Sequence, residues 1–237
     1  MADPPKKRSV TMTQNDVIAP EVNLLHFGLP PGDAMHFLPG QFVTFYVAKN
    51  GATVTRSYSI SSSADQADRF DLCIKKVDGG YVSTYLCGLA QGSELRMMGP
   101  LGRFLLKDPG SRSVLFVCTG TGIAPFIPMT ESLLSQKPDQ PTWLFFGTRH
   151  EEDLLFRKEL ETLCSAHTNF HYVPVLSRPE SNWSGATGHV EGALEEKLPD
   201  LTNCDVYICG VPGMVADVQA LAEQLHCPKD HTFVERY

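Results

Sequence analysis

The spacing of apolar residues changes near the middle of the chain, at the polar stretch Lys107-Asp108-Pro109-Gly110-Ser111. Before this stretch, short runs rich in β-branched and aromatic residues alternate with turns that contain glycine, proline or aspartate. After it, short apolar runs alternate with segments whose apolar residues recur at helical spacing. A chain of 237 residues is long enough for two compact domains. We therefore predict two domains, residues 1–110 and residues 111–237.

The first half contains six strand-like runs, whose number and spacing are typical of a small closed antiparallel β-barrel. The runs are Ser9–Val17, Val22–Phe27, Gln41–Val47, Thr53–Ile60, Phe70–Val77 and Glu94–Met98, and one helical stretch, Tyr81–Leu89, interrupts them. Residues 1–9 are polar and have no apolar segment of the kind found in signal peptides. We therefore predict a disordered start and a cytoplasmic protein.

The second half alternates strands with helices. The predicted strands are Val114–Cys118, Trp143–Phe146, Phe170–Leu176, Val206–Cys209 and Thr232–Tyr237. The predicted helices begin at Pro125 or cover Asp153–Cys164, Leu194–Leu198 and Met214–Leu225. This alternation predicts a doubly wound α/β domain, in which a parallel sheet carries helices on both faces.

Composition excludes several classes of protein. The chain is 42% hydrophobic and 20% charged, as in globular proteins, and no apolar run reaches the roughly 18 residues that span a membrane. The seven cysteines form no C-x-x-C pair, so we expect reduced thiols and no iron–sulfur cluster. His167 and His171 lack a third ligand nearby, and we expect no metal site.

The charge is unevenly distributed between the halves. Residues 1–110 carry 11 Lys and Arg against 10 Asp and Glu, whereas residues 111–237 carry 9 against 17. This balance does not suit a nucleic acid partner. The difference fits an acidic protein that binds the first half, and it fits random surface variation equally well.

A glycine-rich turn, Thr119-Gly120-Thr121-Gly122-Ile123-Ala124-Pro125, follows the first strand of the second half. Glycines let the backbone approach a ligand, and the start of a helix favours phosphate. The pattern is G-x-G-x-x-P, however, and the next strand ends in Phe146-Gly147-Thr148-Arg149 without an acidic residue for a ribose. The residues alone therefore indicate either a nucleotide site or an ordinary connection from strand to helix.

A second candidate motif, Arg56-Ser57-Tyr58-Ser59, ends a strand of the first half. Arginine pairs with phosphate, an aromatic ring stacks on a flat cofactor, and a hydroxyl donates a hydrogen bond. Alternation along the strand places Arg56 and Tyr58 on one face. The segment Gly79-Gly80-Tyr81-Val82-Ser83 then offers backbone amides at the start of a helix. An exposed strand with a surface arginine is the alternative interpretation.

Seven motifs occur together in a fixed order from about Phe37 to the last residue. They are R-S-Y-S, G-G-Y-V-S-T-Y-L, M-G-P-L-G-R-F, G-T-G-I-A-P-F, F-G-T-R, C-G-V-P-G-M and a terminal V-E-R-Y. This ordered set resembles the ferredoxin–NADP(+) reductase family. The resemblance implies that the first domain binds FAD, that the second binds a nicotinamide nucleotide, and that a hydride passes between nicotinamide and flavin.

The resemblance also implies roles for residues around the flavin. Arg56 would contact the diphosphate, Tyr58 would lie against the isoalloxazine beside Ser57, and Ser59 would bind near N5. The second anchor of the diphosphate, which favours FAD over FMN, would be Gly80, Tyr81, Val82 and Ser83. The backbone around Cys73, Ile74 and Lys75 would run alongside the ribityl and adenosine parts of the cofactor. Thr121 would also face the flavin. Tyr237 would stack on the ring and move to admit nicotinamide, and Glu235 would complete a proton path.

For the nucleotide, the resemblance implies a pocket made by Thr121, Gly122, Cys209, Gly210, Pro212 and Met214. Cys209 would lie beside the reacting carbon, which makes Ser59, Cys209, Glu235 and Tyr237 the predicted catalytic residues. Arg149, Ser177 and Arg178 would bind phosphates and favour NADP(H). The run Trp183–Val190 is more similar to oxygenase reductases, several of which use NADH, so NAD(H) stays open.

The predicted activity is that of a monomeric ferredoxin–NADP(+) reductase, with a separate acidic ferredoxin or flavodoxin as partner. Three alternatives stay open. The first is an NADH-dependent reductase of an oxygenase or a free flavin reductase. The second is an electron-transfer subunit of a larger complex, and the third is a flavin-binding module without turnover.

Overall fold

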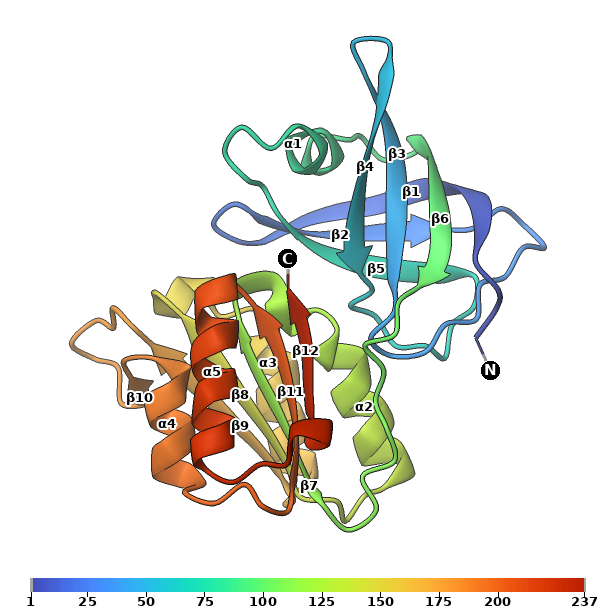
Figure 1. The fold of residues 1–237 in the computed structure, drawn as a ribbon. Helices are drawn as coiled ribbons and strands as arrows, with labels where there is room; N and C mark the ends of the chain where they lie inside the picture. The colour runs from blue at the N-terminus through green and yellow to red at the C-terminus, as the bar shows by residue number, and fades with distance from the viewer. Residues whose placement is uncertain (1, 237) are drawn as a thin grey trace. The chain divides into compact units, whose positions relative to one another are not determined.

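The computed structural model describes residues 2–236. This part of the chain forms two compact units, residues 2–106 with 124–131 and residues 107–123 with 132–236. The first unit is built on an antiparallel sheet of six strands, and the second on a parallel sheet of six strands (Figure 1). The predicted architecture, a barrel followed by a doubly wound α/β domain, is therefore confirmed.

The barrel strands pair in the order β4-β3-β6-β1-β2-β5. They are β1 (Lys6–Ala19), β2 (Val22–Gly28), β3 (Phe42–Lys49), β4 (Ala52–Ser59), β5 (Arg69–Lys75) and β6 (Glu94–Leu101). Ile60, the residue after β4, forms an isolated antiparallel bridge with Leu72 of β5, which closes the barrel. Within the described part of the chain, β4 itself pairs only with β3. One helix, α1 (Tyr81–Cys87), packs against β4 and β5.

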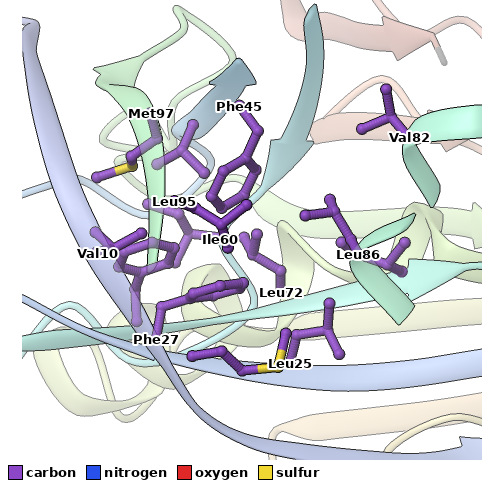
Figure 2. Packing of buried hydrophobic residues seen from close by; sticks show 14 of the residues in the cluster. Val10, Leu25, Phe27, Phe45, Ile60, Leu72, Val82, Leu86, Leu95 and Met97 are labelled. Carbon is purple, nitrogen blue, oxygen red and sulfur yellow. The ribbon is translucent and has the colours of Figure 1, made fainter. Parts of the chain in front are cut away.

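The barrel core consists of inward side chains of β1, β2, β3, β5 and β6, and the partly buried Val54 and Tyr58 of β4 pack against it. Phe27, Phe45 and Phe70 are fully buried. The ring centroid of Phe27 lies 5.2 Å from that of Phe45 and 5.4 Å from that of Phe70. Figure 2 shows this core, to which α1 adds Val82 and Leu86. Burying a side chain of this size stabilises the fold by about 1.5–3 kcal/mol. The core therefore fixes α1 on the barrel.

The prediction of a disordered start is wrong for the described residues. Strand β1 begins at Lys6, where it pairs with Gly99 of β6. Arg8 is 4% exposed, and its guanidinium donates to Asp3 over 2.9 Å. A backbone hydrogen bond from His36 lowers the pKa of the Asp3 carboxyl. Composition misled here because a buried, paired arginine looks the same in a sequence as an exposed one.

The second unit is a parallel sheet in the order β10-β9-β8-β7-β11-β12. Its strands are β7 (Ser113–Thr119), β8 (Thr142–Thr148), β9 (Phe170–Leu176), β10 (Ala186–Thr187), β11 (Cys204–Gly210) and β12 (Thr232–Arg236). The helices are α2 (Phe126–Gln136), α3 (Arg157–Ala166), α4 (Val190–Lys197) and α5 (Pro212–Gln224). Side chains of α4 and α5 share one core with β7, β8, β9 and β11, so these two helices cover the same face of the sheet. All of β11 is buried, as expected for a central parallel strand.

Three local features differ from the predictions. Helix α3 begins at Arg157, because residues 151–153 form a 3₁₀ turn and Phe156 adopts a left-handed conformation with φ 54°. Helix α4 begins at Val190, four residues before the predicted start. The first turn was not predicted because Gly192 has a low helix propensity. The glycine-rich turn forms a 3₁₀ helix, Gly120–Ile123, before α2 starts at Phe126.

Among residues 2–236, no helix has the length and apolar character needed to cross a membrane. The same residues contain no group of three histidine, cysteine or acidic side chains that could hold a metal ion.

Candidate active site

In the barrel unit, the predicted flavin residues of β4 lie on a strand that is unusually exposed. Arg56 and Tyr58 stand opposite the buried residues Phe45 and Val43 of β3, so they share the inward face. The Arg56 guanidinium donates to the neighbouring Thr55 carbonyl over 2.8 Å, and it forms no ion pair with a carboxylate of residues 2–236. Arg56 therefore offers an exposed cation at the open side of β4.

Tyr58 presents a ring that is anchored in the core. Its centroid lies 6.5 Å from that of Phe45, and the ring packs against the barrel core. Burial raises the pKa of Tyr58 to about 12, with a further contribution from Cys87 and an opposing one from Arg56. The hydroxyl is therefore protonated at neutral pH. Ser57 belongs to the outer face, where its hydroxyl lies 2.9 Å from that of Thr44, and Ser59 ends the strand.

The start of α1 is a turn that requires glycine. A Cβ at Gly80 would lie 2.8 Å from the Ser83 hydroxyl oxygen and 2.9 Å from the Val77 carbonyl oxygen. The Ser83 hydroxyl donates to the Gly80 carbonyl and accepts from the Val77 amide, each over 3.1 Å. Its proton is thus used within the turn. The first amides of α1 have no partner inside the helix, because helix geometry gives them none, and these amides are the groups available to a phosphate.

The structure also shows where the side chains of Tyr81 and of residues 73–75 lie. The Tyr81 side chain turns toward the β3–β4 hairpin, where its hydroxyl donates to the Ala48 carbonyl over 2.7 Å. Cys73 and Ile74 of β5 are buried and Lys75 is exposed. Burial raises the pKa of the Cys73 thiol to about 12. Cys73 and Ile74 can therefore meet a ligand only through their backbone.

In the α/β unit, the structure brings two distant motifs together at the carboxyl ends of β7 and β11. A Cβ at Gly122 would lie 2.3 Å from the Cys209 carbonyl oxygen. A Cβ at Gly210 would lie 2.5 Å from the Met214 methyl carbon and 2.6 Å from the Thr119 hydroxyl oxygen. Side chains at either position would fill this space. The glycine-rich turn and the segment after β11 thus form one close-packed backbone surface, with Thr121 in its 3₁₀ helix and Pro212 beginning α5.

Cys209 lies in the middle of this surface, opposite Cys118 of β7 and Glu235 of β12. It is 2% exposed. Burial raises the pKa of its thiol well above the usual value, and the charge of Glu235 adds to this effect. The thiol is therefore protonated at neutral pH and is not a nucleophile. Tyr237, the remaining predicted catalytic residue, lies outside the described residues.

Two arginines lie side by side where β8 and β9 end. The Arg178 amide donates to the Arg149 carbonyl over 2.9 Å, and the Ser177 amide donates to the Thr148 carbonyl over 3.0 Å. Both arginines are exposed, and neither forms an ion pair within residues 2–236. The Ser177 hydroxyl donates to the Thr148 carbonyl over 3.3 Å. The edge therefore presents two free guanidinium groups, and the serine proton is already used.

Sequence reasoning missed Gly147 and Cys118 as parts of this surface. A Cβ at Gly147 would lie 2.8 Å from a Val190 methyl carbon and 3.0 Å from the Thr119 methyl carbon, so the start of α4 meets the glycine-rich turn. A glycine inside a buried strand was the available signal for this close approach. Cys118 gave no signal, because its pairing with Cys209 depends on the order of the strands.

These features fit the two ligands that the motifs suggest. The flavin side combines an arginine that forms no ion pair within residues 2–236, an anchored ring beside an open strand edge and a turn that tolerates only glycine. The nucleotide side combines close-packed glycines with exposed cations at the carboxyl edge of a parallel sheet, where such domains bind ligands.

Comparison with known proteins agrees with this fit. Residues 9–105 match the oxidoreductase FAD-binding domain family, and residues 116–220 match the oxidoreductase NAD-binding domain family. Ferredoxin–NADP reductase B of Sorangium cellulosum is 39% identical over 228 residues, which cover 93% of each protein. The toluate 1,2-dioxygenase electron transfer component of Pseudomonas putida is 36% identical over 183 residues, 77% of this chain and 53% of that protein. The structure of an Amycolatopsis cytochrome P450 reductase has a TM-score of 0.90 at 27% identity, over 98% of this chain and 70% of that one.

The fold, the two sites and these matches define a flavoprotein oxidoreductase with an FAD-binding and an NAD(P)-binding domain. The chain belongs to the ferredoxin–NADP(+) reductase family. The resemblance of its motifs to that family is thereby confirmed.

Proposed function

We propose that this protein is a ferredoxin–NADP(+) reductase that uses NADPH and exchanges electrons with a separate ferredoxin or flavodoxin. Residues 1–110 bind FAD and residues 111–237 bind the nucleotide. The observation that carries the choice of NADPH is the pair of free arginines, Arg149 and Arg178, at one edge of the sheet. The similarity to ferredoxin–NADP reductase B over 93% of both proteins supports the choice of acceptor. We also propose that the protein is a monomer and that it acts in the cytoplasm.

On the flavin side, the chain binds and orients the cofactor. Bound FAD supplies the chemistry, because a flavin accepts two electrons together and releases them singly. Arg56 neutralises the diphosphate, and the amides of Tyr81, Val82 and Ser83, which follow the tight turn at Gly80, form its second anchor. The Tyr58 ring makes one wall of the site, and Ser57, whose hydroxyl lies beside that of Thr44 on the other face of the strand, contributes its backbone. Ser59 hydrogen-bonds at the reacting edge of the ring system. The backbone of Cys73, Ile74 and Lys75 contacts the ribityl and adenosine parts of the cofactor.

On the nucleotide side, the chain fixes the reacting end of the nicotinamide. Thr121, Gly122, Gly210, Pro212 and Met214 form the pocket, and the glycines allow a close approach of the backbone. Cys209 contributes a neutral thiol that packs against the ring, so no covalent step involves it. Glu235 holds or passes a proton beside Cys209, and Tyr237 covers the flavin until nicotinamide replaces it. Arg149, Arg178 and Ser177 bind the phosphates of NADPH.

A second candidate function is an NADH-dependent reductase of an oxygenase. Two observations favour it. The toluate dioxygenase component of Pseudomonas putida is 36% identical to this chain. The Ser177 hydroxyl already donates to the Thr148 carbonyl, which removes one donor from a site for the 2′-phosphate.

Reduction of cytochrome c in the presence of NADPH tests the proposed acceptor. The purified protein with FAD should reduce cytochrome c slowly by itself and much faster when a bacterial ferredoxin or flavodoxin is added. A matched reaction with NADH in place of NADPH gives the nucleotide preference. If neither acidic protein increases the rate while free FMN is reduced rapidly, the protein is a flavin reductase and the proposal is wrong.

A further inference from the structure

One face of the α/β sheet carries a row of three aromatic rings across β7, β11 and β12. Phe116, Tyr207 and Phe233 are neighbours in the strand register. The ring centroid of Tyr207 lies 5.6 Å from that of Phe116 and 4.6 Å from that of Phe233. Tyr207 is fully buried, so this row is a fixed part of the core.

The next row on the same face is the candidate reaction site. Two residues further along each strand, the register aligns Cys118, Cys209 and Glu235. Side chains two residues apart on a strand point to the same side. The aromatic row therefore lies directly beside the row that holds Cys209 and Glu235.

Strand β12 needs such support, because it is short and lies at the edge of the sheet. It has five residues, and among residues 2–236 it pairs only with β11. Short strands at the edge of a sheet open more readily than central strands. Opening of β12 would remove Glu235 from its place opposite Cys209.

Lys107, which precedes the first strand of the sheet, contacts both β11 and β12. Its ammonium nitrogen lies 4.2 Å from the centroid of the Phe233 ring, a cation–π contact. Its backbone amide donates to the Tyr207 hydroxyl over 2.9 Å. One residue thus binds the rings of both β11 and β12, at the row next to Cys209 and Glu235.

We infer that Lys107 and Phe233 are positioning residues for nucleotide oxidation. Together they hold β12 in register, so that Glu235 stays opposite Cys209 while the nicotinamide is bound. The inference rests on the proposed function for the role of Cys209 and Glu235, but the anchoring of β12 can be measured without any nucleotide.

The experiment compares Lys107→Met, Lys107→Arg, Phe233→Leu and the double variant Lys107→Met/Phe233→Leu in the FAD-loaded protein. Lys107→Met removes the charge and keeps the backbone amide, and Lys107→Arg restores a cation. Lys137→Met is the matched control for loss of a cation, because Lys137 belongs to the same unit and pairs with Asp108. Amide hydrogen exchange of β12 and iodoacetamide labelling of Cys209, mapped by mass spectrometry, report its opening. Anaerobic flavin bleaching by NADPH reports the reaction.

We expect exchange and labelling to be about threefold faster in Lys107→Met and about tenfold faster in Phe233→Leu. Exchange in β7 should be unchanged, and Lys107→Arg and Lys137→Met should behave as the wild type. The double variant should equal Phe233→Leu, because the lysine acts through the ring. The bleaching rate at saturating NADPH should fall about threefold or more in Phe233→Leu, with unchanged half-saturation.

Unchanged exchange in both single variants would overturn the inference. Faster exchange with an unchanged bleaching rate would overturn it too, because the two residues would then only stabilise the fold. A wild-type protein that no nucleotide bleaches would instead contradict the proposed function, while exchange and labelling would still measure the anchoring of β12.

Discussion

Arg178 is the residue that should separate the two nucleotides. Its guanidinium is exposed and free of carboxylates within residues 2–236, and its amide is bound to the Arg149 carbonyl. Replacing it with alanine removes a charged hydrogen bond worth about 1.5–3 kcal/mol. We expect Arg178→Ala to raise KM for NADPH about ten- to hundredfold and to leave KM for NADH nearly unchanged. Steady-state kinetics with both nucleotides check this, with Lys137→Ala as the control for loss of a cation. Equal losses for NADPH and NADH would show that Arg178 does not read the 2′-phosphate.

Tyr58 should hold the flavin through its ring and not through its hydroxyl. The ring is packed on the barrel core, and burial keeps the phenol protonated by raising its pKa to about 12. Tyr58→Ala should therefore lower the fraction of protein that retains FAD after gel filtration, whereas Tyr58→Phe should retain it. The ratio of flavin to protein absorbance gives the result. Equal FAD content in the wild type and Tyr58→Ala would remove this residue from the site.

At the level of elements, the turn before α1 should be essential for the cofactor. A Cβ at Gly80 would collide with the Ser83 hydroxyl and the Val77 carbonyl, so Gly80→Ala must shift the first turn of the helix. We expect this variant to lose FAD while its far-ultraviolet circular dichroism stays that of the wild type. Thr84→Ala, an exposed change on the same helix, is the control. Full FAD retention in Gly80→Ala would mean that the first backbone amides of α1 do not bind the diphosphate.

Most strands could be predicted from the sequence because they have a strong local pattern. The two-residue strand β10 was missed, and helix starts depended on contacts that the sequence does not display. All six barrel strands were expected within a few residues of their positions. The start of α3 was misplaced because Phe156 takes a left-handed backbone conformation, which is rare for an aromatic residue. The start of α4 was misplaced because packing of Val190 against Gly147 outweighs the low helix propensity of Gly192.

For the whole molecule, buried thiols and phenols predict lower stability in alkali. Burial raises the pKa of Cys73 and Tyr207 to about 12 and that of Cys204 to about 11, against reference values of 9.0 and 10.0. Between about pH 9 and about pH 12, the unfolded chain loses these protons first and the folded chain keeps them. The folded state then binds more protons, so the free energy of unfolding must fall as the pH rises.

Urea unfolding at about pH 8 and about pH 11 measures this loss. The midpoint should drop as the pH rises, and the drop should be smaller in Cys73→Ala than in the wild type. A midpoint that stays constant over this range would contradict the assigned direction of these pKa shifts.

The candidate site was only partly accessible from the sequence, because it is assembled from segments that are distant along the chain. The motifs selected Gly122, Cys209 and Arg178 individually, by their resemblance to a family. That Gly122 touches the backbone of Cys209, and that Arg178 lies beside Arg149, follows from the order β9-β8-β7-β11. The hydrogen bonds that use up the Ser83 and Ser177 hydroxyl protons were not predictable, since they depend on local turn geometry.

Anaerobic mixing of the FAD-loaded protein with NADPH, and separately with NADH, is the most direct test of the account. The visible absorption of the flavin should bleach with NADPH, and NADH should require a concentration about tenfold higher or more. A protein that binds no flavin, or whose flavin neither nucleotide bleaches, would contradict the assignment of this chain as an FAD-dependent reductase that uses NADPH.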